Sequence, residues 1–277
     1  MDSLLPTIDL CGKRVTRLIC GGNPLSGNSH VSGELDREMR SYFTMAKIQE
    51  LLDECEKNGI NTVQSRADHH QMRMYLEHRD RGGQLMWIAQ TASEYADIER
   101  NIDETAGYGA IAIYNHGTHT DNSWHAGKMD DVLTVVKAIR KLGLPAGVGT
   151  HKPEVVQFIE KEGWPVDFYM CCFYDLARGY KAAPMIDRDA YARERYPAGD
   201  PAAMTAVMRA VKKPCLGFKI MAASRNCATP DATRSAFKFA FDNIKPTDAV
   251  VVGMFPKYTN QAAQNAAFVR EITAGSI

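Results

Sequence analysis

The segment 110–152 constrains the fold of this 277-residue chain more than any other part of the sequence. It holds two apolar runs of strand length, at 110–115 and 146–150. Between them, residues 129–143 place apolar side chains at the spacing of one helical face: Val132, Val135, Val136, Ile139 and Leu142. A strand, a helix and a second strand joined by short loops form a βαβ unit, whose two strands run parallel.

Both apolar runs of this unit end in histidine. His116 follows the first run, with His119 just beyond it, and His151 follows the second. Parallel strands end on the same side of a sheet, and α/β proteins carry out their chemistry on that side. We therefore expect His116 and His151 to face one pocket.

The rest of the chain repeats this alternation. We expect strands at 14–21, 60–66, 85–91, 110–115, 146–150, 167–174, 215–222 and 249–254, and helices at 44–57, 68–79, 95–105, 129–143, 153–162, 201–211, 230–244 and 259–273. Eight such units in a chain of this length predict an α/β fold of the closed (β/α)8 TIM barrel type. A doubly wound open sheet is the rival, but no Gly-x-Gly-x-x-Gly follows the first strand.

We expect a single domain over 1–277, with a polar insertion at about 177–199 after the sixth strand. Lysine plus arginine equals aspartate plus glutamate, so no charge excess favours nucleic acid or a membrane as partner. No apolar run reaches the length of a transmembrane helix, and we find no signal peptide. Seven cysteines, an odd number lying mostly in apolar runs, indicate reduced thiols in a cytoplasmic protein. The expected partner is a small molecule, and the sequence does not predict an oligomeric state.

In a barrel, the polar residues at the carboxyl ends of the strands define the site. Converging imidazoles and a carboxylate would suit a divalent zinc, manganese or iron ion. The predicted metal ligands are His30, Asp68, His116 and His151. The predicted substrate-binding residues are Asn23, Arg66, Gln90, Asn115 and Arg225. The alternative for each histidine is a structural role, in which its ring hydrogen-bonds the backbone of a loop.

The predicted catalytic residues are His116, His151, Lys219 and Tyr174. Lys219 lies within the apolar run 215–222. Burial inside the barrel would lower its pKa and suit it for proton transfer or for a Schiff base. The alternative is a lysine that forms an ion pair with a carboxylate within the layers of the barrel.

Five short segments resemble the aldo/keto reductase superfamily, and together they span most of the chain. They are 15–25 (Val-Thr-Arg-Leu-Ile-Cys-Gly-Gly-Asn-Pro-Leu), 57–62 (Lys-Asn-Gly-Ile-Asn-Thr), 113–116 (Ile-Tyr-Asn-His), 147–151 (Gly-Val-Gly-Thr-His) and 250–254 with 261–265. The resemblance implies a (β/α)8 barrel. It also implies NADPH-dependent carbonyl reduction by an Asp, Tyr, Lys and His tetrad, with Lys257 near a phosphate of the cofactor.

Of that tetrad, only the histidine is kept, as His116. The aspartate position falls on Gln64 or Ser65, the segment 67–70 lacks the tyrosine, and Gln90-Thr91 replaces the lysine. We therefore expect NADPH to bind weakly or not at all.

The function predicted from these residues is acid–base chemistry of the lyase or isomerase type, with or without assistance from a metal ion. The substrate would be a small polyhydroxy or oxo compound resembling a carbohydrate. One alternative is an NAD(P)H-dependent oxidoreductase with a rebuilt proton donor, Tyr174 or His116. The other is a non-catalytic barrel that binds a small molecule.

Overall fold

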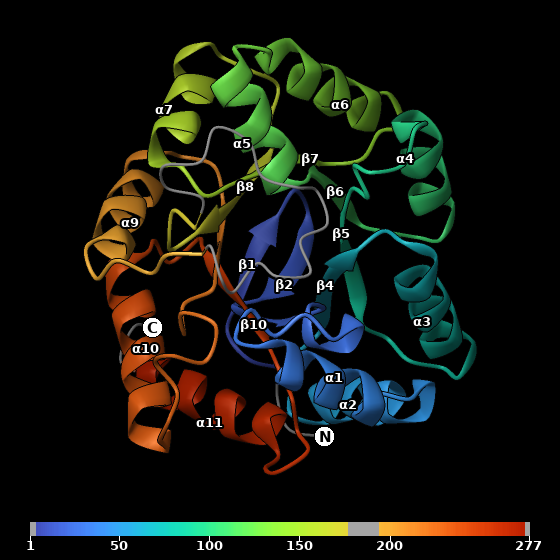
Figure 1. Ribbon diagram of the computed structural model, residues 1–277, viewed down its shortest axis with the longest axis vertical. Helices are drawn as coiled ribbons and strands as arrows, with labels where there is room; N and C mark the ends of the chain where they lie inside the picture. The colour runs from blue at the N-terminus through green and yellow to red at the C-terminus, as the bar shows by residue number, and fades with distance from the viewer. Residues whose placement is uncertain (1–3, 177–193, 275–277) are drawn as a thin grey trace.

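The computed structural model describes residues 4–176 and 194–274. Eight parallel strands close into a barrel in the order β10-β3-β4-β5-β6-β7-β8-β9, which Figure 1 shows end-on. The strands are β3 (Leu18–Gly21), β4 (Thr62–Arg66), β5 (Met86–Gln90), β6 (Ala112–Asn115), β7 (Ala146–Thr150), β8 (Phe168–Cys172), β9 (Cys215–Phe218) and β10 (Ala249–Gly253). The predicted (β/α)8 fold is confirmed.

Helices surround the barrel and cover its outer face (Figure 1). They are α2 (Met45–Lys57), α3 (His69–Asp80), α4 (Ile98–Gly107), α6 (Met129–Lys141), α7 (Pro153–Lys161), α9 (Asp200–Ala210), α10 (Pro230–Asn243) and α11 (Gln261–Thr273). Thr44, Asp97 and Thr229 cap three of them by accepting a hydrogen bond from the backbone N–H three residues on. All eight expected helices are present, with ends shifted by a few residues.

The first expected strand, 14–21, is wrong as a single element. It divides at Arg17 into β2 (Lys13–Thr16) and β3, and β2 pairs antiparallel with β1 (Thr7–Leu10). The buried Arg17 side chain donates to the carbonyl oxygens of Asp248 and Lys245, which fastens the chain where it changes partner. The hairpin's Ile8, Leu10 and Val15 pack with the inward side chains of the barrel, so the hairpin plugs the end at which the strands begin.

Two segments that lie between the expected strands and helices contain further helices. The polar segment after β3 holds the short η1 (Pro24–Ser26) and the helix α1 (Gly33–Tyr42), which begins at the capping residue Ser32. The segment after His116 forms α5 (Gly117–Ala126), which ends at the left-handed Gly127. Sequence periodicity did not reveal α5 because its buried face carries small and polar residues: Gly117, Thr120, Asp121 and Ser123.

Two expected strands also end earlier. The sixth ends at Cys172 and the seventh at Phe218, so Lys219 follows its strand rather than lying within it. Of the insertion at 177–199, residues 177–193 lie outside the described part of the chain. All seven cysteines are unpaired, and no helix in the described ranges is long and apolar enough to cross a membrane.

Candidate active site

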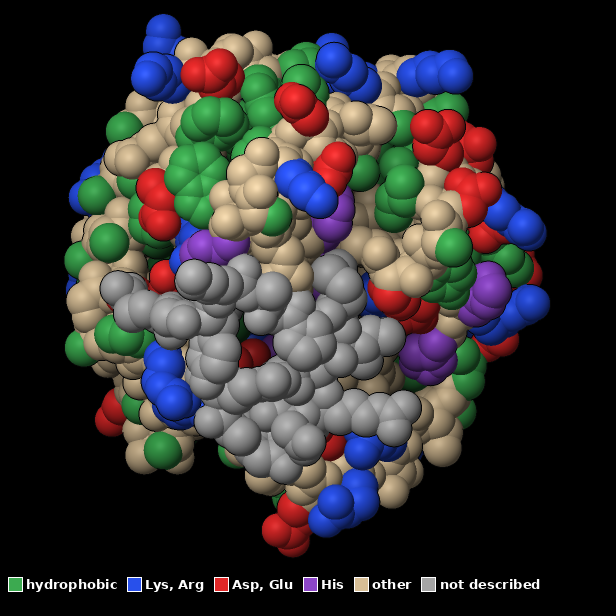
Figure 2. All heavy atoms as spheres, turned by 45° about the horizontal axis from the view of Figure 1, so that its top comes forward, with side chains coloured by type: hydrophobic (Ala, Val, Ile, Leu, Met, Phe, Trp, Pro, Cys, Tyr) green, Lys and Arg blue, Asp and Glu red, His purple; other side chains and the backbone are tan. Residues whose placement is uncertain are grey.

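The candidate site lies where the barrel strands end. Because all eight strands are parallel, the residues that follow them share one rim of the barrel. His116 follows β6, His151 follows β7, Cys172 ends β8 and Lys219 follows β9. His30, between η1 and α1, is close enough to His151 and Lys219 for their charges to act on its pKa. On the face in Figure 2, some histidine side chains lie near the centre, beside acidic and basic ones.

His151 and Asp121 form a hydrogen-bonded pair at this rim. The His151 Nδ1 atom lies 2.6 Å from the Asp121 Oδ2 atom. Asp121 comes from α5, is buried, and also accepts a 2.6 Å bond from the Thr150 hydroxyl. A carboxylate only accepts, so the pair places the His151 proton on Nδ1 and leaves Nε2 with its lone pair. The Phe218 ring packs against the imidazole with a centroid distance of 5.7 Å.

The sequence does not predict a role for Asp121, because it gives no apolar periodic signal for α5. Its signal in the sequence is helical spacing: Gly117, Thr120 and Asp121 lie on one buried face. Gly117 allows this helix to begin against β7, since a Cβ atom there would lie 3.3 Å from the Cε1 atom of His151. The close approach brings the Asp121 carboxylate within reach of the histidine.

His116 begins α5, and its Nδ1 atom is buried without a hydrogen-bond partner among the described residues. Burial lowers the pKa of His116 well below its ordinary value, and the nearby charges of Arg66, His151 and His119 lower it further. Its imidazole is therefore neutral at neutral pH. A neutral imidazole can donate a hydrogen bond without carrying a charge into the site.

A chain of hydrogen bonds crosses the barrel below these histidines. The Tyr114 hydroxyl accepts from Gln64 at 2.7 Å and donates to Gln90 at 2.8 Å. Burial raises the pKa of Tyr114, so its hydroxyl stays protonated. Arg66 forms an ion pair with Glu94. The predicted substrate-binding residues Gln90 and Arg66 are thus at the site, but each already has a partner.

His30 is held on both sides of its ring. Its Nδ1 atom lies 2.6 Å from Glu194 Oε1, and its Nε2 atom lies 3.1 Å from the Asn23 amide nitrogen. The Tyr196 hydroxyl donates to the other Glu194 oxygen at 2.6 Å. Burial and the Lys219 charge lower the pKa of His30, although Glu194 opposes this change. Glu194 lies in the expected insertion, where the sequence gave no periodic signal.

Lys219 is held in an unusual backbone conformation at the end of β9. Its φ is 58°, in the left-handed region that residues other than glycine seldom adopt. Its Nζ atom is buried and has no hydrogen-bond partner among the described residues. Burial lowers the pKa of Lys219; Glu194 and Cys172 oppose this change, and Arg225 adds to it.

Two other predicted catalytic or binding residues support neighbouring loops. Tyr174 is buried and its hydroxyl accepts from the Asn226 amide at 3.2 Å. Arg225 donates to the carbonyl oxygens of Ala222, Ala223 and His30, and stacks over the Tyr196 ring at 4.0 Å. These contacts tie the loop after β9 to the segment around His30.

Asn115 and Lys257 are also occupied by contacts within the protein. Asn115 is buried beneath α5, where it binds the Thr120 hydroxyl at 2.8 Å and the His119 ring at 3.0 Å. Lys257 forms a surface ion pair with Glu38 at 2.6 Å. Neither side chain is free in this arrangement to bind a substrate or cofactor.

The four predicted metal ligands do not form one donor cluster. Asp68 caps α3 by accepting from the Gln71 N–H at 3.0 Å, and both nitrogens of His30 have partners. Within 4–176 and 194–274, no group of three or more histidine, cysteine, aspartate or glutamate side chains is placed to hold a metal ion. His116 and His151 remain as neighbouring imidazoles.

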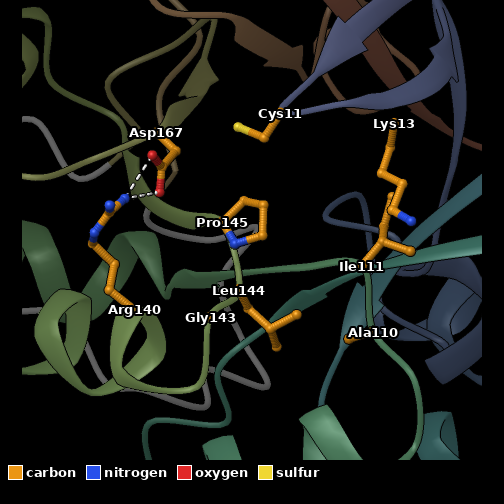
Figure 3. A pocket seen from close by; sticks show the side chains of 9 residues that line it. All are labelled: Cys11, Lys13, Ala110, Ile111, Arg140, Gly143, Leu144, Pro145 and Asp167. Carbon is orange, nitrogen blue, oxygen red and sulfur yellow. Dashed lines mark hydrogen bonds and ion pairs between the residues drawn. The ribbon is translucent and has the colours of Figure 1, made fainter.

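A separate cavity of about 490 Å³ lies at the opposite end of the barrel (Figure 3). Its walls come from the turn of the hairpin and from the residues that precede β6, β7 and β8: Cys11, Lys13, Ala110, Ile111, Arg140, Gly143, Leu144, Pro145 and Asp167. Arg140 and Asp167 form an ion pair there, with a 2.6 Å bond from Nη1 to Oδ1. In barrels, this end serves stability rather than catalysis.

No protein-family model and no curated protein matches the chain. Solved structures share its fold at low identity. The apo form of Gox0644 has a TM-score of 0.58 and 9% identity, covering 98% of this chain and 94% of that one. Dihydropteroate synthase from Xanthomonas albilineans has a TM-score of 0.56 and 10% identity, covering 99% of this chain and 98% of that one. The aldo-keto reductase AKR11C1 from Bacillus halodurans has a TM-score of 0.56 and 11% identity, covering 98% of this chain and 96% of that one.

The chain is thus similar in fold to aldo-keto reductases and to other TIM barrels alike. This finding agrees with the divergent aldo/keto reductase-like barrel that the sequence resemblance implied. At these identities the likeness concerns the fold alone. A shared fold does not determine function, which depends on the side chains of the site.

Proposed function

We propose that this protein is an enzyme that moves protons on the carbon next to a carbonyl group in a small, polar substrate. The reaction would be an isomerisation, an elimination or an aldol cleavage. The observation that carries this proposal is the 2.6 Å bond between His151 Nδ1 and the buried Asp121. It leaves an oriented basic nitrogen at the mouth of a barrel.

His151 is suited to act as the general base. Asp121 fixes its tautomer and ring orientation, so that Nε2 can accept a proton from the substrate. Once protonated, the imidazolium is stabilised by the carboxylate 2.6 Å away. Thr150 holds Asp121 in turn, which limits rotation of the carboxylate.

His116 is suited to stabilise the oxygen of the reacting carbonyl. Negative charge develops on this oxygen when the neighbouring carbon loses a proton. A neutral imidazole beside the cationic Arg66 can donate a hydrogen bond to it. A polyhydroxy or oxo compound would bring such a carbonyl oxygen to the site.

The residues that the resemblance places near NADPH do not fit that cofactor well. Lys257, which the resemblance places near a phosphate of the cofactor, forms an ion pair with Glu38. The tetrad tyrosine has no counterpart in the segment 67–70. These contacts favour proton transfer over reduction by a nicotinamide.

The test is hydrogen exchange at the reacting carbon. The protein would be incubated in D₂O with glyceraldehyde, dihydroxyacetone and pyruvate in turn, and loss of the proton signal next to the carbonyl followed by NMR. Asp121→Asn and His151→Gln should each slow exchange by roughly two to four orders of magnitude. Asp167→Asn, in the ion pair at the far end of the barrel, is the matched control and should keep the rate.

Two outcomes would overturn the proposal. One is that the protein exchanges none of these carbonyl compounds above the rate in buffer. The other is that Asp121→Asn and Asp167→Asn exchange at the same rate, which would make the His151–Asp121 pair structural.

A further inference from the structure

We propose that Lys219 forms a Schiff base with the carbonyl carbon of the substrate, making it a further catalytic residue of the site. This inference rests on the proposed function, because it concerns the same carbonyl compound. The observation behind it is the buried Nζ atom that has no hydrogen-bond partner among the described residues.

Two other lysines with low side-chain exposure have a structural role, and each forms an ion pair with an aspartate. Lys152 Nζ lies 3.0 Å from Asp175, and Lys245 Nζ lies 3.0 Å from Asp248. A buried ammonium group without such a partner is costly, since burial removes its hydration. Lys219 has the burial without the ion pair, which is the arrangement of a reacting amine rather than of a structural cation.

The nearest carboxylate to consider is that of Glu194. Its two oxygens bind His30 and the Tyr196 hydroxyl, so it acts on Lys219 through its charge and not through a hydrogen bond. Burial lowers the pKa of Lys219 more than Glu194 and Cys172 raise it. Compared with a surface lysine, a larger share of Lys219 is therefore the neutral amine, which is the nucleophilic form.

The backbone also directs Lys219 to the site. Its φ of 58° turns the chain out of β9 directly after Phe218, whose ring packs against His151. His30 is close enough to both Lys219 and His151 for their charges to lower its pKa. Such uncommon backbone conformations cluster at functional sites, where the surrounding structure holds them in place.

The proposed step balances without an oxidant or reductant. The Nζ lone pair attacks the carbonyl carbon, and a proton moves from nitrogen to the oxygen to give a carbinolamine. This hydroxyl takes up a proton and leaves as water, so the product is a protonated imine. His151 then removes the proton on the neighbouring carbon. The C–H electron pair forms a C=C bond to the former carbonyl carbon, and the C=N π pair moves onto nitrogen, which gives an enamine. Reprotonation and hydrolysis return the free lysine.

The experiment is reductive trapping of the imine. The full-length protein would be mixed with glyceraldehyde, dihydroxyacetone or pyruvate, reduced with sodium borohydride, digested, and mapped by mass spectrometry. We expect a single adduct per chain, on Lys219, with loss of the exchange activity. Lys152, held by Asp175, is the internal control and should stay unmodified.

Two variants sharpen the assignment. Lys219→Arg keeps a cation but cannot form an imine, and Lys219→Met keeps the length without the charge; both should lose the adduct. Lys213→Met, at a partly exposed ion pair with Glu160 near the start of β9, is the matched control and should keep it.

The trapping and exchange assays separate the two proposals. Exchange by the wild-type protein without an adduct on Lys219 would overturn the Schiff base while leaving the proposed function intact. Full exchange by Lys219→Arg would do the same, and would make Lys219 a cation that binds an anionic group of the substrate. An adduct on Lys219 with unchanged exchange in Asp121→Asn would instead refute the role of His151.

Discussion

The neutral state of His116, whose Nδ1 atom is buried, predicts how the protein's stability changes with pH. The folded pKa of His116 lies well below its ordinary value of 6.5, because burial and neighbouring cations disfavour the charged form. The unfolded chain therefore binds this proton at a higher pH than the folded protein does. As the pH falls below about 6.5, protonation favours unfolding, so the free energy of unfolding decreases.

The magnitude follows from the linkage relation. One proton bound only by the unfolded state changes the free energy of unfolding by about 1.4 kcal/mol per pH unit. From pH 7.5 to 5, the lowered pKa of His116 therefore decreases the free energy of unfolding by up to about 2 kcal/mol. The pKa values of His30 and His119 are lowered as well, chiefly by burial, so they add slopes of the same sign.

The variant His116→Gln removes the titrating imidazole and keeps a polar side chain. Urea unfolding would be followed by circular dichroism from pH 7.5 to 5, above the range in which most carboxylates titrate. The decrease in stability over this range should be smaller in the variant than in the wild type, by up to about 2 kcal/mol. His70→Gln, at an exposed position, supplies the reference slope. Parallel curves for wild type and His116→Gln would refute the reasoning, because His116 would then titrate alike in both states.

Three further predictions concern the packing of the barrel and the binding of NADPH. Tyr114→Phe removes the hydroxyl shared by Gln64 and Gln90 and should cost about 1–3 kcal/mol of unfolding free energy in urea titrations; no loss would mean that the amides find other partners. Gly22→Ala would place a Cβ atom 2.5 Å from the Ser65 Cβ and 2.9 Å from its Cα, so we expect a loss of about 1–3 kcal/mol, and an unchanged Tm would contradict this packing. NADPH should bind more weakly than low micromolar in a nicotinamide-fluorescence titration, and a tighter dissociation constant would restore the reductase alternative.

The barrel could be predicted because its signals are local and repeated. Apolar runs of strand length alternate with helical faces such as that of α6, and each unit can be recognised without knowing the others. The hairpin was not foreseen because β2 and β3 form one continuous pattern in the sequence. The break at Arg17 depends on hydrogen bonds to Asp248 and Lys245, more than 200 residues away along the chain.

The site was predictable only in part. Its strand-end residues His116 and His151 could be named because parallel strands share one rim. Their partners could not be named, since Asp121 reaches His151 from a helix without an apolar face, and Glu194 reaches His30 from a polar segment. Side chains predicted to bind substrate, such as Asn115, proved to be occupied by neighbours that periodicity does not reveal.

The sequence alone determined the alternation of strands and helices, and with it the end of the barrel that carries the polar residues. Only the tertiary structure decided which of these residues are free to react. His30 and His151 both bind a carboxylate. Within 4–176 and 194–274, one nitrogen of the His151 ring has no hydrogen-bond partner, whereas both nitrogens of His30 have one. Lys152 and Lys219 both follow barrel strands, but among the described residues Lys152 has an aspartate partner and Lys219 has none. The reason is that reactivity depends on burial and on partners brought together by folding, which spacing along the chain does not record.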